Sequence, residues 1–317
     1  MSSLTSPDPV PRYFLLGPTA SGKTSVGLKL ASLLNAEILS MDSMLVYRGM
    51  DLGTAKPSAQ EQAEVPHHLI DLVEPHQEFS VAQWMGSALS VEKCLAEKGK
   101  AALYLGGTNL YLKALTGGLM NGPDIPESLQ KELRAQSETR EGRAELLGEL
   151  HRVDSASAQK LHPNDQRRIL RALEVFRASG RPLSSWQEQW GEKKALGVPA
   201  VALHWPREVL RARVSQRFQD MLVSGFVEEV RAIKKTSGYS ATASKALGYA
   251  QVLSHLAGKC TLEEAKEKAI TLTRTFIRRQ MTWLRSFPDL KWLTVGKSQS
   301  AELLAQQVAI LFREETP

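Results

Sequence analysis

The amino-acid sequence predicts an α/β fold, in which a parallel β-sheet is covered by helices and interrupted by a helical insertion. Three observations lead to this prediction. The first 115 residues alternate short apolar runs with amphipathic segments, which is typical of a parallel sheet. Residues 124–195 are charged and have a helical pattern without a convincing strand. A strand pattern returns at residues 201–205, and long helices follow it.

The first part of the chain contains four apolar runs of strand length, at residues 12–16, 36–40, 69–73 and 101–105. Between the first two runs, residues 25–34 have apolar side chains at helical spacing, which predicts a helix. A second helix is expected over residues 81–98, because Ser80 is a preferred N-cap residue. Strands and helices therefore alternate, as the crossovers of a parallel sheet require.

Turn signals mark the point where this pattern ends, at Gly117-Gly118 and at Asn121-Gly122-Pro123. We therefore expect a core whose first part is residues 1–120, a helical insertion domain of residues 121–197, and a second core part of residues 198–317.

The second part of the core is expected to contain a long helix. Thr261 and Glu264 form a capping-box pattern, and the helix that they begin should extend for about 25 residues. A last strand is expected at residues 291–295 and a last helix at 301–314.

Residues 17–24 match the phosphate-binding pattern G-x-x-x-x-G-K-[ST] in full, and they lie between a predicted strand and a predicted helix. The glycines let backbone N–H groups surround phosphate oxygens, and the helix directs the positive end of its dipole at the same anion. Lys23 adds a point charge, and Thr24 is a candidate Mg²⁺ ligand. The core is therefore expected to be P-loop NTPase-like and to bind a di- or triphosphate through Gly17, Pro18, Thr19, Ala20, Ser21, Gly22, Lys23 and Thr24.

Asp42 and Ser43 follow the predicted strand at residues 36–40, at the edge where open α/β sheets place their ligands. A carboxylate that faces a bound phosphate is unfavourable unless it contacts Mg²⁺ or removes a proton from a nucleophile. Asp42 is therefore a candidate functional residue, and a solvated loop aspartate is the alternative.

The composition is that of a globular protein, with 42% hydrophobic residues, a net charge of +6 and a pI of about 9.2. This charge permits a polyanionic partner without requiring one. Its distribution is more informative, because residues 166–181 contain five arginines and one acid, and residues 274–285 contain four arginines and no acid. Two distant cysteines and the lack of a signal or membrane-span pattern favour a cytoplasmic protein that does not enter a membrane.

Residues 41–57, which read MDSMLVYRGMDLGTAKP, resemble the tRNA dimethylallyltransferase (tRNA isopentenyltransferase) family, and the resemblance continues along nearly the whole chain. It includes residues 66–71 (PHHLID), 106–111 (GGTNLY), 162–168 (HPNDQRR), 171–175 (RALEV), 216–218 (QRF), 221–222 (ML), 225–226 (GF), 247–249 (LGY) and 279–285 (RQMTWLR). The chain resembles the bacterial type, because its C-terminal part contains no zinc-finger pattern. The resemblance implies transfer of a dimethylallyl group from dimethylallyl diphosphate to the exocyclic N6 of the adenosine 3′-adjacent to the anticodon.

The resemblance also implies the catalytic residues. Asp42 would act as the general base, while Lys23, Arg217 and a Mg²⁺ ion on Thr24 would stabilise the leaving diphosphate. Arg213, one helical turn before Arg217, is the alternative. Thr108 would contact the tRNA in the active site, although the sequence alone is equally compatible with a helix N-cap, and Gly106-Gly107 before it suggest close backbone approach to a ligand.

The partner that the resemblance implies is a tRNA anticodon stem-loop, bound by a monomeric enzyme. The expected tRNA-binding residues are Asp42, Ser43, Met44, Leu45, Thr108, Gln130, Gln166, Arg167, Arg168, Ile169, Leu170, Lys245, Leu247, Gly248, Tyr249, Arg278, Arg279, Gln280 and Arg285. The chain departs from the family pattern at Lys245 and Ala250, where arginines can occur, so the base contacts at these two positions stay open.

Two other functions are compatible with the phosphate-binding loop. In a small-molecule P-loop kinase, Asp42 would orient a substrate hydroxyl and Arg217 would stabilise the transferred phosphoryl group. A nucleotide-dependent RNA-binding protein without covalent chemistry would leave Asp42 and Thr108 without a role.

Overall fold

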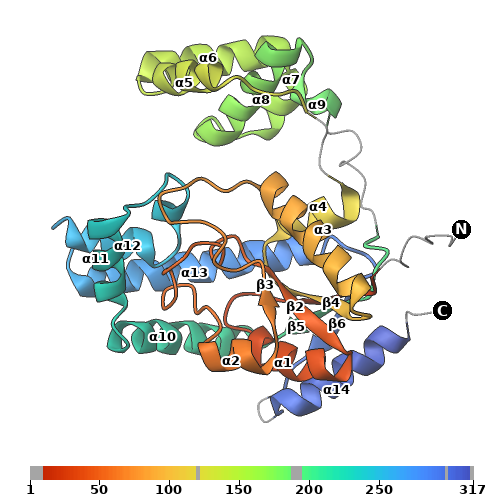
Figure 1. Cartoon of the computed structure of the whole chain (residues 1–317). Helices are drawn as coiled ribbons and strands as arrows, with labels where there is room; N and C mark the ends of the chain where they lie inside the picture. Colours follow the sequence, from red (N-terminus) through yellow and green to blue (C-terminus); the bar gives the residue numbers. More distant parts are fainter. Residues whose placement is uncertain (1–9, 119–121, 187–194, 297–298, 315–317) are drawn as a thin grey trace, which may run out of the picture. The chain divides into compact units, whose positions relative to one another are not determined.

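The computed structural model describes residues 10–118, 122–186, 195–296 and 299–314. The chain forms two compact units, one made of residues 1–116 and 194–317 and the other of residues 117–193. Figure 1 shows the helices and strands of the two units. The smaller unit, residues 117–193, corresponds to the insertion domain predicted at residues 121–197.

The larger unit is built on a six-stranded, entirely parallel sheet. Its strands, in spatial order, are β3 (His67–His68), β2 (Ala36–Met41), β4 (Ala101–Gly106), β1 (Arg12–Leu16), β5 (Ala200–His204) and β6 (Lys291–Thr294). Leu16 and Met41 are both register partners of Gly106, so β1, β2 and β4 end side by side. The loops that follow these three strands therefore meet at one edge, where parallel sheets place their ligands.

The strand predicted at residues 69–73 is wrong. The edge strand is only His67–His68, and of the predicted residues Val73 forms just an isolated bridge with Tyr47. Leu69 and Asp71 have φ angles of 65° and 52°, which an extended strand cannot contain. Lys56 forms an ion pair with Asp71, and this tertiary contact accompanies the irregular backbone.

Helices cover both faces of the sheet. They are α1 (Lys23–Leu33), α2 (Ala59–Glu64), α3 (Val81–Glu97), α4 (Asn109–Gly117), α10 (Arg207–Val223), α11 (Phe226–Thr236), α12 (Tyr249–Leu256), α13 (Leu262–Leu284) and α14 (Ala301–Arg313), with a 3₁₀ turn at Ala243–Lys245. Ser80 caps α3, and Thr261 with Glu264 forms the capping box of α13, as predicted. No helix in the described part of the chain is long and apolar enough to cross a membrane.

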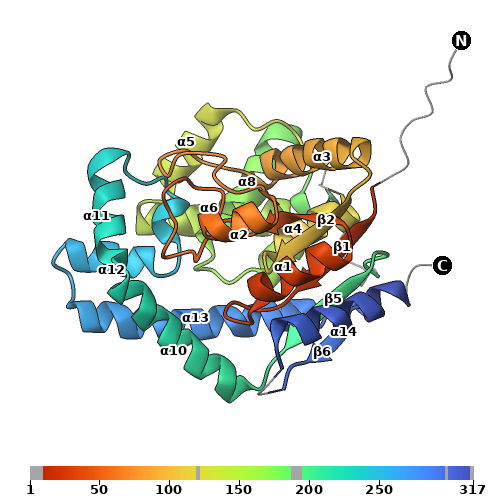
Figure 2. The same ribbon diagram turned by 60° about the horizontal axis from the view of Figure 1, so that its bottom comes forward.

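The two faces of the sheet have separate apolar cores. On one face, Ile38 and Leu103 belong to a cluster with the apolar residues of α1 and α14, and these two helices lie side by side (Figures 1 and 2). On the other face, Leu39 and Tyr104 belong to a cluster that includes residues of α3, α10 and α13. Alternate residues of one strand point to opposite faces, so the continuous apolar runs seen in the sequence are what a sheet covered on both sides requires.

The smaller unit contains helices and no strand among its described residues; the helices are α5 (Glu127–Gln136), α6 (Arg140–Val153), α7 (Ser155–Lys160), α8 (Gln166–Ser179) and α9 (Leu183–Trp186). Its core contains Leu133, Leu146, Leu150, Ile169 and Leu173 from three of these helices. Arg177 of α8 binds Glu149 of α6 through two nitrogens, at 2.9 and 2.6 Å, and its third nitrogen donates to Glu132 of α5 at 2.8 Å.

Candidate active site

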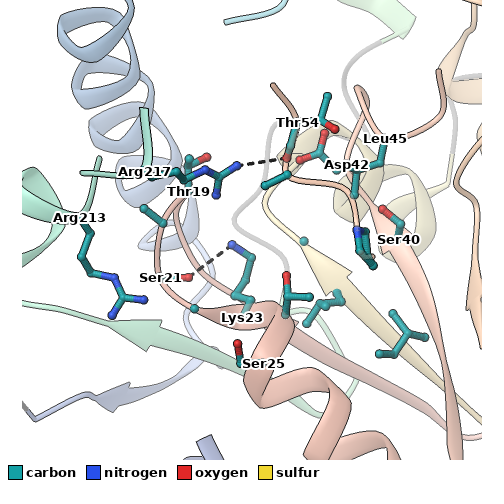
Figure 3. Close-up of a pocket in the computed structure, with 18 of the residues that line it drawn as sticks. Thr19, Ser21, Lys23, Ser25, Ser40, Asp42, Leu45, Thr54, Arg213 and Arg217 are labelled. Atoms are coloured by element: carbon teal, nitrogen blue, oxygen red, sulfur yellow. Dashed lines mark hydrogen bonds between the residues drawn. The ribbon is translucent and has the colours of Figure 1, made fainter. Parts of the chain in front are cut away.

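A pocket of about 400 Å³ lies at the edge where β1, β2 and β4 end (Figure 3). The loop between β1 and α1 supplies one wall, through Thr19–Thr24. Asp42, which follows β2, and Arg213 and Arg217 of α10 line the same pocket. The structure therefore brings Lys23, Asp42 and Arg217 together, although they are far apart in sequence.

The phosphate-binding loop has the backbone that its sequence predicts. Gly17 and Gly22 have φ angles of 147° and 79°, which residues with a side chain rarely adopt. A Cβ at Gly17 would also lie 3.2 Å from the carbonyl oxygen of Leu203. Gly22 is the N-cap of α1 and has no side chain with which to cap it, so the N–H groups of the first turn are available to an anion.

Lys23 lies in this loop as a half-buried cation. Its Nζ donates to the carbonyl oxygen of Pro18 at 2.8 Å and lies 3.4 Å from Oγ of Ser21 (Figure 3). Burial lowers the pKa of the Lys23 ammonium to about 8, the Arg217 guanidinium also lowers it, and the Asp42 carboxylate opposes both effects. A bound anion would reduce this cost, because it adds negative charge next to the ammonium.

Two arginines of α10 reach the pocket, one helical turn apart. Arg217 donates from Nη2 to the carbonyl oxygen of Thr54 at 3.1 Å (Figure 3), and burial lowers the pKa of its guanidinium against the effect of Asp42. Arg213 stacks on Trp205 with 4.5 Å between the guanidinium carbon and the ring centroid. Trp205 in turn donates from Nε1 to the carbonyl oxygen of Ser21 at 2.8 Å, so Trp205 connects Arg213 to the phosphate-binding loop.

Asp42 and Thr108 lie in neighbouring loops that are joined by hydrogen bonds. Oδ1 of Asp42 accepts the N–H of Met44 at 2.8 Å, which orients the carboxylate. Oγ1 of Thr108 accepts the N–H of Ser43 at 3.2 Å, and the N–H of Thr108 donates to the carbonyl oxygen of Met41 at 3.1 Å. Thr108 therefore supports the segment that carries Asp42.

The two glycines before Thr108 are explained by protein contacts, and not by the ligand contact that their sequence suggested. A Cβ at Gly106 would lie 2.4 Å from the carbonyl oxygen of Met41. A Cβ at Gly107 would lie 2.4 Å from Nε2 of Gln280 and 3.0 Å from the carbonyl oxygen of Gly17. The pair therefore lets three backbone segments converge below the pocket.

Gln280 of α13 connects two of these segments. Its Oε1 accepts the N–H of Thr19 at 3.0 Å, its Nε2 donates to the carbonyl oxygen of Gly107 at 3.0 Å, and its residue surface is 4% exposed. Sequence reasoning placed Gln280 on the tRNA surface, but the structure gives its amide internal partners. Its helical spacing from Ile277, Met281 and Leu284, which are buried, could have indicated this.

Glu229 is a structural residue of the site that sequence reasoning missed. From α11 it accepts the N–H groups of Asp51 at 3.1 Å and Leu52 at 2.7 Å, and also the hydroxyl of Tyr249 at 2.5 Å. These bonds fix the segment that leads to Thr54, whose carbonyl oxygen holds Arg217. No local sequence pattern predicts the contacts with Asp51 and Leu52, because Glu229 is 178 and 177 positions away from them.

Most of the predicted tRNA-binding residues fall into three groups according to side-chain exposure. The side chains of Ile169, Tyr249 and Gln280 are buried and belong to the interior of their units. Those of Arg167, Arg168, Lys245, Arg278, Arg279 and Arg285 are exposed, and Ser43, Met44, Leu45, Gln130, Gln166, Leu170 and Leu247 are half-buried. Only residues of the second and third kinds can present a side chain to RNA without rearrangement.

The arginines of α13 line a groove of about 540 Å³ between α10 and α13, here called the arginine groove. Arg274, Arg278 and Arg285 form one side and Arg207 and Arg211 the other, with no acid among the described residues that line it. On α8 the balance differs from that expected, because Arg168 pairs with Asp165, Arg171 with Glu174, and Arg177 with Glu149 and Glu132.

Residues 45–287 match the model of the IPP transferase family. The chain belongs to the IPP transferase family. A tRNA dimethylallyltransferase of Pelotomaculum thermopropionicum is 38% identical over 312 residues, which cover 98% of both chains.

Solved structures of IPP transferases are similar to the chain over nearly its whole length. The full-length tRNA isopentenylpyrophosphate transferase of Bacillus halodurans has a TM-score of 0.69 and 32% identity, and the match covers 96% of this chain and 98% of the other. A eukaryotic dimethylallyltransferase acting on tRNA has a TM-score of 0.76 and 25% identity, with 95% of this chain and 78% of the other covered.

Proposed function

We propose that this chain transfers a dimethylallyl group from dimethylallyl diphosphate to the N6 atom of the tRNA adenosine 3′-adjacent to the anticodon. The observation that carries the proposal is the convergence of a phosphate-binding loop, the cations Lys23 and Arg217 and the Asp42 carboxylate in a single pocket of an IPP transferase. The P-loop alone is compatible with a small-molecule kinase, but family membership favours the prenyl transfer.

The proposed reaction forms a bond between N6 and the allylic carbon and breaks the bond between that carbon and the diphosphate oxygen. The N6 lone pair is delocalised into the adenine ring, so attack requires removal of the N6 proton, which we assign to the Asp42 carboxylate. The diphosphate leaves with the electron pair of the broken bond. Lys23, Arg217 and the loop N–H groups would stabilise the charge that develops on it.

A Mg²⁺ ion is part of this proposal. In proteins Mg²⁺ usually keeps several waters and binds through one or two side chains together with substrate phosphates. The pocket suits such an ion, because Thr24 lines it and carries a hydroxyl that can serve as one ligand beside the diphosphate. When bound, the ion would neutralise part of the diphosphate charge.

The tRNA would present its target adenine from an anticodon loop, where extrusion of a base costs less than in a duplex. We propose that the exposed arginines of α13 and α8 bind its phosphates, and that the loops at Asp42 and Thr108 lie against the extruded base. The pocket is formed by one chain, so a monomer would suffice, and a tRNA substrate makes the cytoplasm the proposed compartment.

The proposal is tested by a transfer assay in nucleotide-free buffer that contains Mg²⁺, unmodified tRNA and radiolabelled dimethylallyl diphosphate. Label is expected in the tRNA without added ATP, and ATP should not be hydrolysed. Strict dependence on ATP would contradict the prenyl transfer and favour the kinase.

The charge of Lys23 predicts a pH dependence of anion binding. Since the pKa of Lys23 is about 8 without a ligand, its ammonium is charged below that pH and neutral above it. Affinity for inorganic diphosphate, measured by calorimetry, is therefore expected to fall as the pH rises above about 8.

Lys23→Arg is the matched control, because a guanidinium stays protonated throughout this pH range. Protonation of diphosphate itself affects both proteins equally, so only the difference between their pH profiles reports on Lys23. The same profile for wild type and Lys23→Arg would show that Lys23 does not cause the loss of affinity.

The arginines predict how tRNA affinity responds to salt. Each phosphate contact releases counterions, so Arg278→Ala and Arg167→Ala should each reduce the slope of log affinity against log salt by about 1. Arg313→Ala, an exposed arginine of α14, is the control and should leave the slope unchanged. Equal slopes in all three variants would remove Arg278 and Arg167 from the tRNA surface.

A further inference from the structure

Two polar atoms of the pocket have no hydrogen-bond partner in the described structure. They are Oγ of Ser40 and Nε2 of His67, each with almost no accessible surface. Both residues line the pocket, and Ser40 is only 3% exposed. Since most buried polar atoms in proteins are paired, two unpaired atoms in one substrate pocket indicate a partner that enters with a ligand.

The two atoms lie in the apolar part of the pocket. Ile38 and Ser40 are two positions apart on β2 and so face the same side of the sheet. His67 is the register partner of Ile38, and Leu105 is the register partner of Ser40. Figure 3 shows Ser40 and Leu45 across the pocket from Ser21 and Arg213. The diphosphate cradle is therefore at one end, and Ser40 and His67 are at the other.

The chemistry of this polar pair is defined by the imidazole. Nδ1 of His67 lies 2.7 Å from the carbonyl oxygen of Val65, which can only accept, so Nδ1 carries the proton. Burial lowers the pKa of His67, which favours the neutral ring. Nε2 is then an acceptor, while the Ser40 hydroxyl can donate. A hydroxyl on the substrate can donate to Nε2 and accept from the Ser40 hydroxyl.

We propose that this end of the pocket receives a hydroxyl on the prenyl chain, with Ser40 and His67 as residues that determine prenyl specificity. The substrate would be a five-carbon allylic diphosphate with a hydroxyl on one terminal methyl group, used in addition to dimethylallyl diphosphate. This inference rests on the proposed function.

The reaction at the diphosphate end of the prenyl group is unchanged. The N6–carbon bond forms, the carbon–oxygen bond to diphosphate breaks, Asp42 accepts the N6 proton, and diphosphate leaves with the electron pair. The hydroxyl takes part in no bond change and is retained in the product.

The experiment offers the full-length protein unmodified tRNA with equal concentrations of dimethylallyl diphosphate and its 4-hydroxy derivative. The ratio of the two modified nucleosides, measured by mass spectrometry, gives the ratio of the two kcat/KM values. For the wild type the hydroxylated substrate is expected to be used at least as efficiently as dimethylallyl diphosphate.

Three variants locate the effect. Ser40→Ala and His67→Asn should each lower kcat/KM for the hydroxylated substrate by about tenfold, since each removes one hydrogen bond to it. Both should leave kcat/KM for dimethylallyl diphosphate within about threefold, which also shows that they fold. An asparagine amide can replace Nδ1 as the donor to Val65 but has no counterpart of Nε2. Ser25→Ala, at an exposed serine of the same pocket, should not change the ratio.

Several results would overturn the inference. A wild type that rejects the hydroxylated substrate by about 100-fold or more would mean that a retained water satisfies the two atoms. A ratio that is unaffected by Ser40→Ala and His67→Asn would place the hydroxyl elsewhere. Transfer from neither diphosphate would instead contradict the proposed function itself.

Discussion

Asp42→Ala is expected to lower the kcat of transfer by at least about 100-fold while tRNA affinity stays within a few-fold. A general base acts mainly in the transition state, where its loss typically costs about 10²–10⁴ in rate, and it contributes little to ground-state binding. Single-turnover kinetics with saturating tRNA would measure the effect without interference from product release.

Asp42→Asn separates the two possible roles of this side chain. An asparagine keeps an Oδ1 that can accept the N–H of Met44, so the local turn should persist, but its amide cannot remove a proton. The rate is therefore expected to fall as far as in Asp42→Ala. A near-normal rate for Asp42→Asn would show that Asp42 only orders the loop.

Arg217→Ala is expected to lower kcat/KM for dimethylallyl diphosphate by about 10²–10³, which is the usual effect of removing one donor that stabilises transition-state charge. Arg217 is suited to this role because the carbonyl oxygen of Thr54 fixes it and its guanidinium stays positive even when buried. Initial rates at varied diphosphate concentration would measure the loss. Arg217→Lys should recover only part of it, since an ammonium lacks the planar fork of donors.

Arg213→Ala is the matched control for this prediction. Arg213 is on the same helix and lines the same pocket, but its guanidinium stacks on Trp205. A loss below about tenfold is expected for it, as for a charge at the edge of a site. If Arg213→Ala lowered kcat/KM more than Arg217→Ala, Arg213 would be the residue that stabilises the leaving diphosphate.

The family resemblance and the pocket support each other through different residues. The match to the IPP transferase family begins at residue 45, after the phosphate-binding loop and Asp42. The structure then places Lys23 and Asp42 beside Arg217, which lies inside the matched region. The proposed mechanism therefore combines Lys23 and Asp42, which precede the matched region, with Arg217, which lies inside it.

Local patterns in the sequence determined the elements of this protein. N-caps and capping boxes need at most four consecutive residues, and the N-cap at Ser80 and the capping box at Thr261 begin their helices as predicted. The phosphate-binding loop is likewise local, because its glycines and Lys23 are adjacent in the chain. Apolar runs in alternation with helices were sufficient to predict a parallel sheet.

Tertiary structure decided everything that depends on distant partners. The run at residues 69–73 has the composition of a strand, yet positive φ angles at Leu69 and Asp71 end the strand at His68. Arg177 is one of the five arginines of residues 166–181, but it forms ion pairs with Glu149 and Glu132 from two other helices. Gln280 likewise binds a loop that is more than 250 residues away. Such contacts follow from how elements pack, and a single sequence records which residues are available for them but not which ones meet.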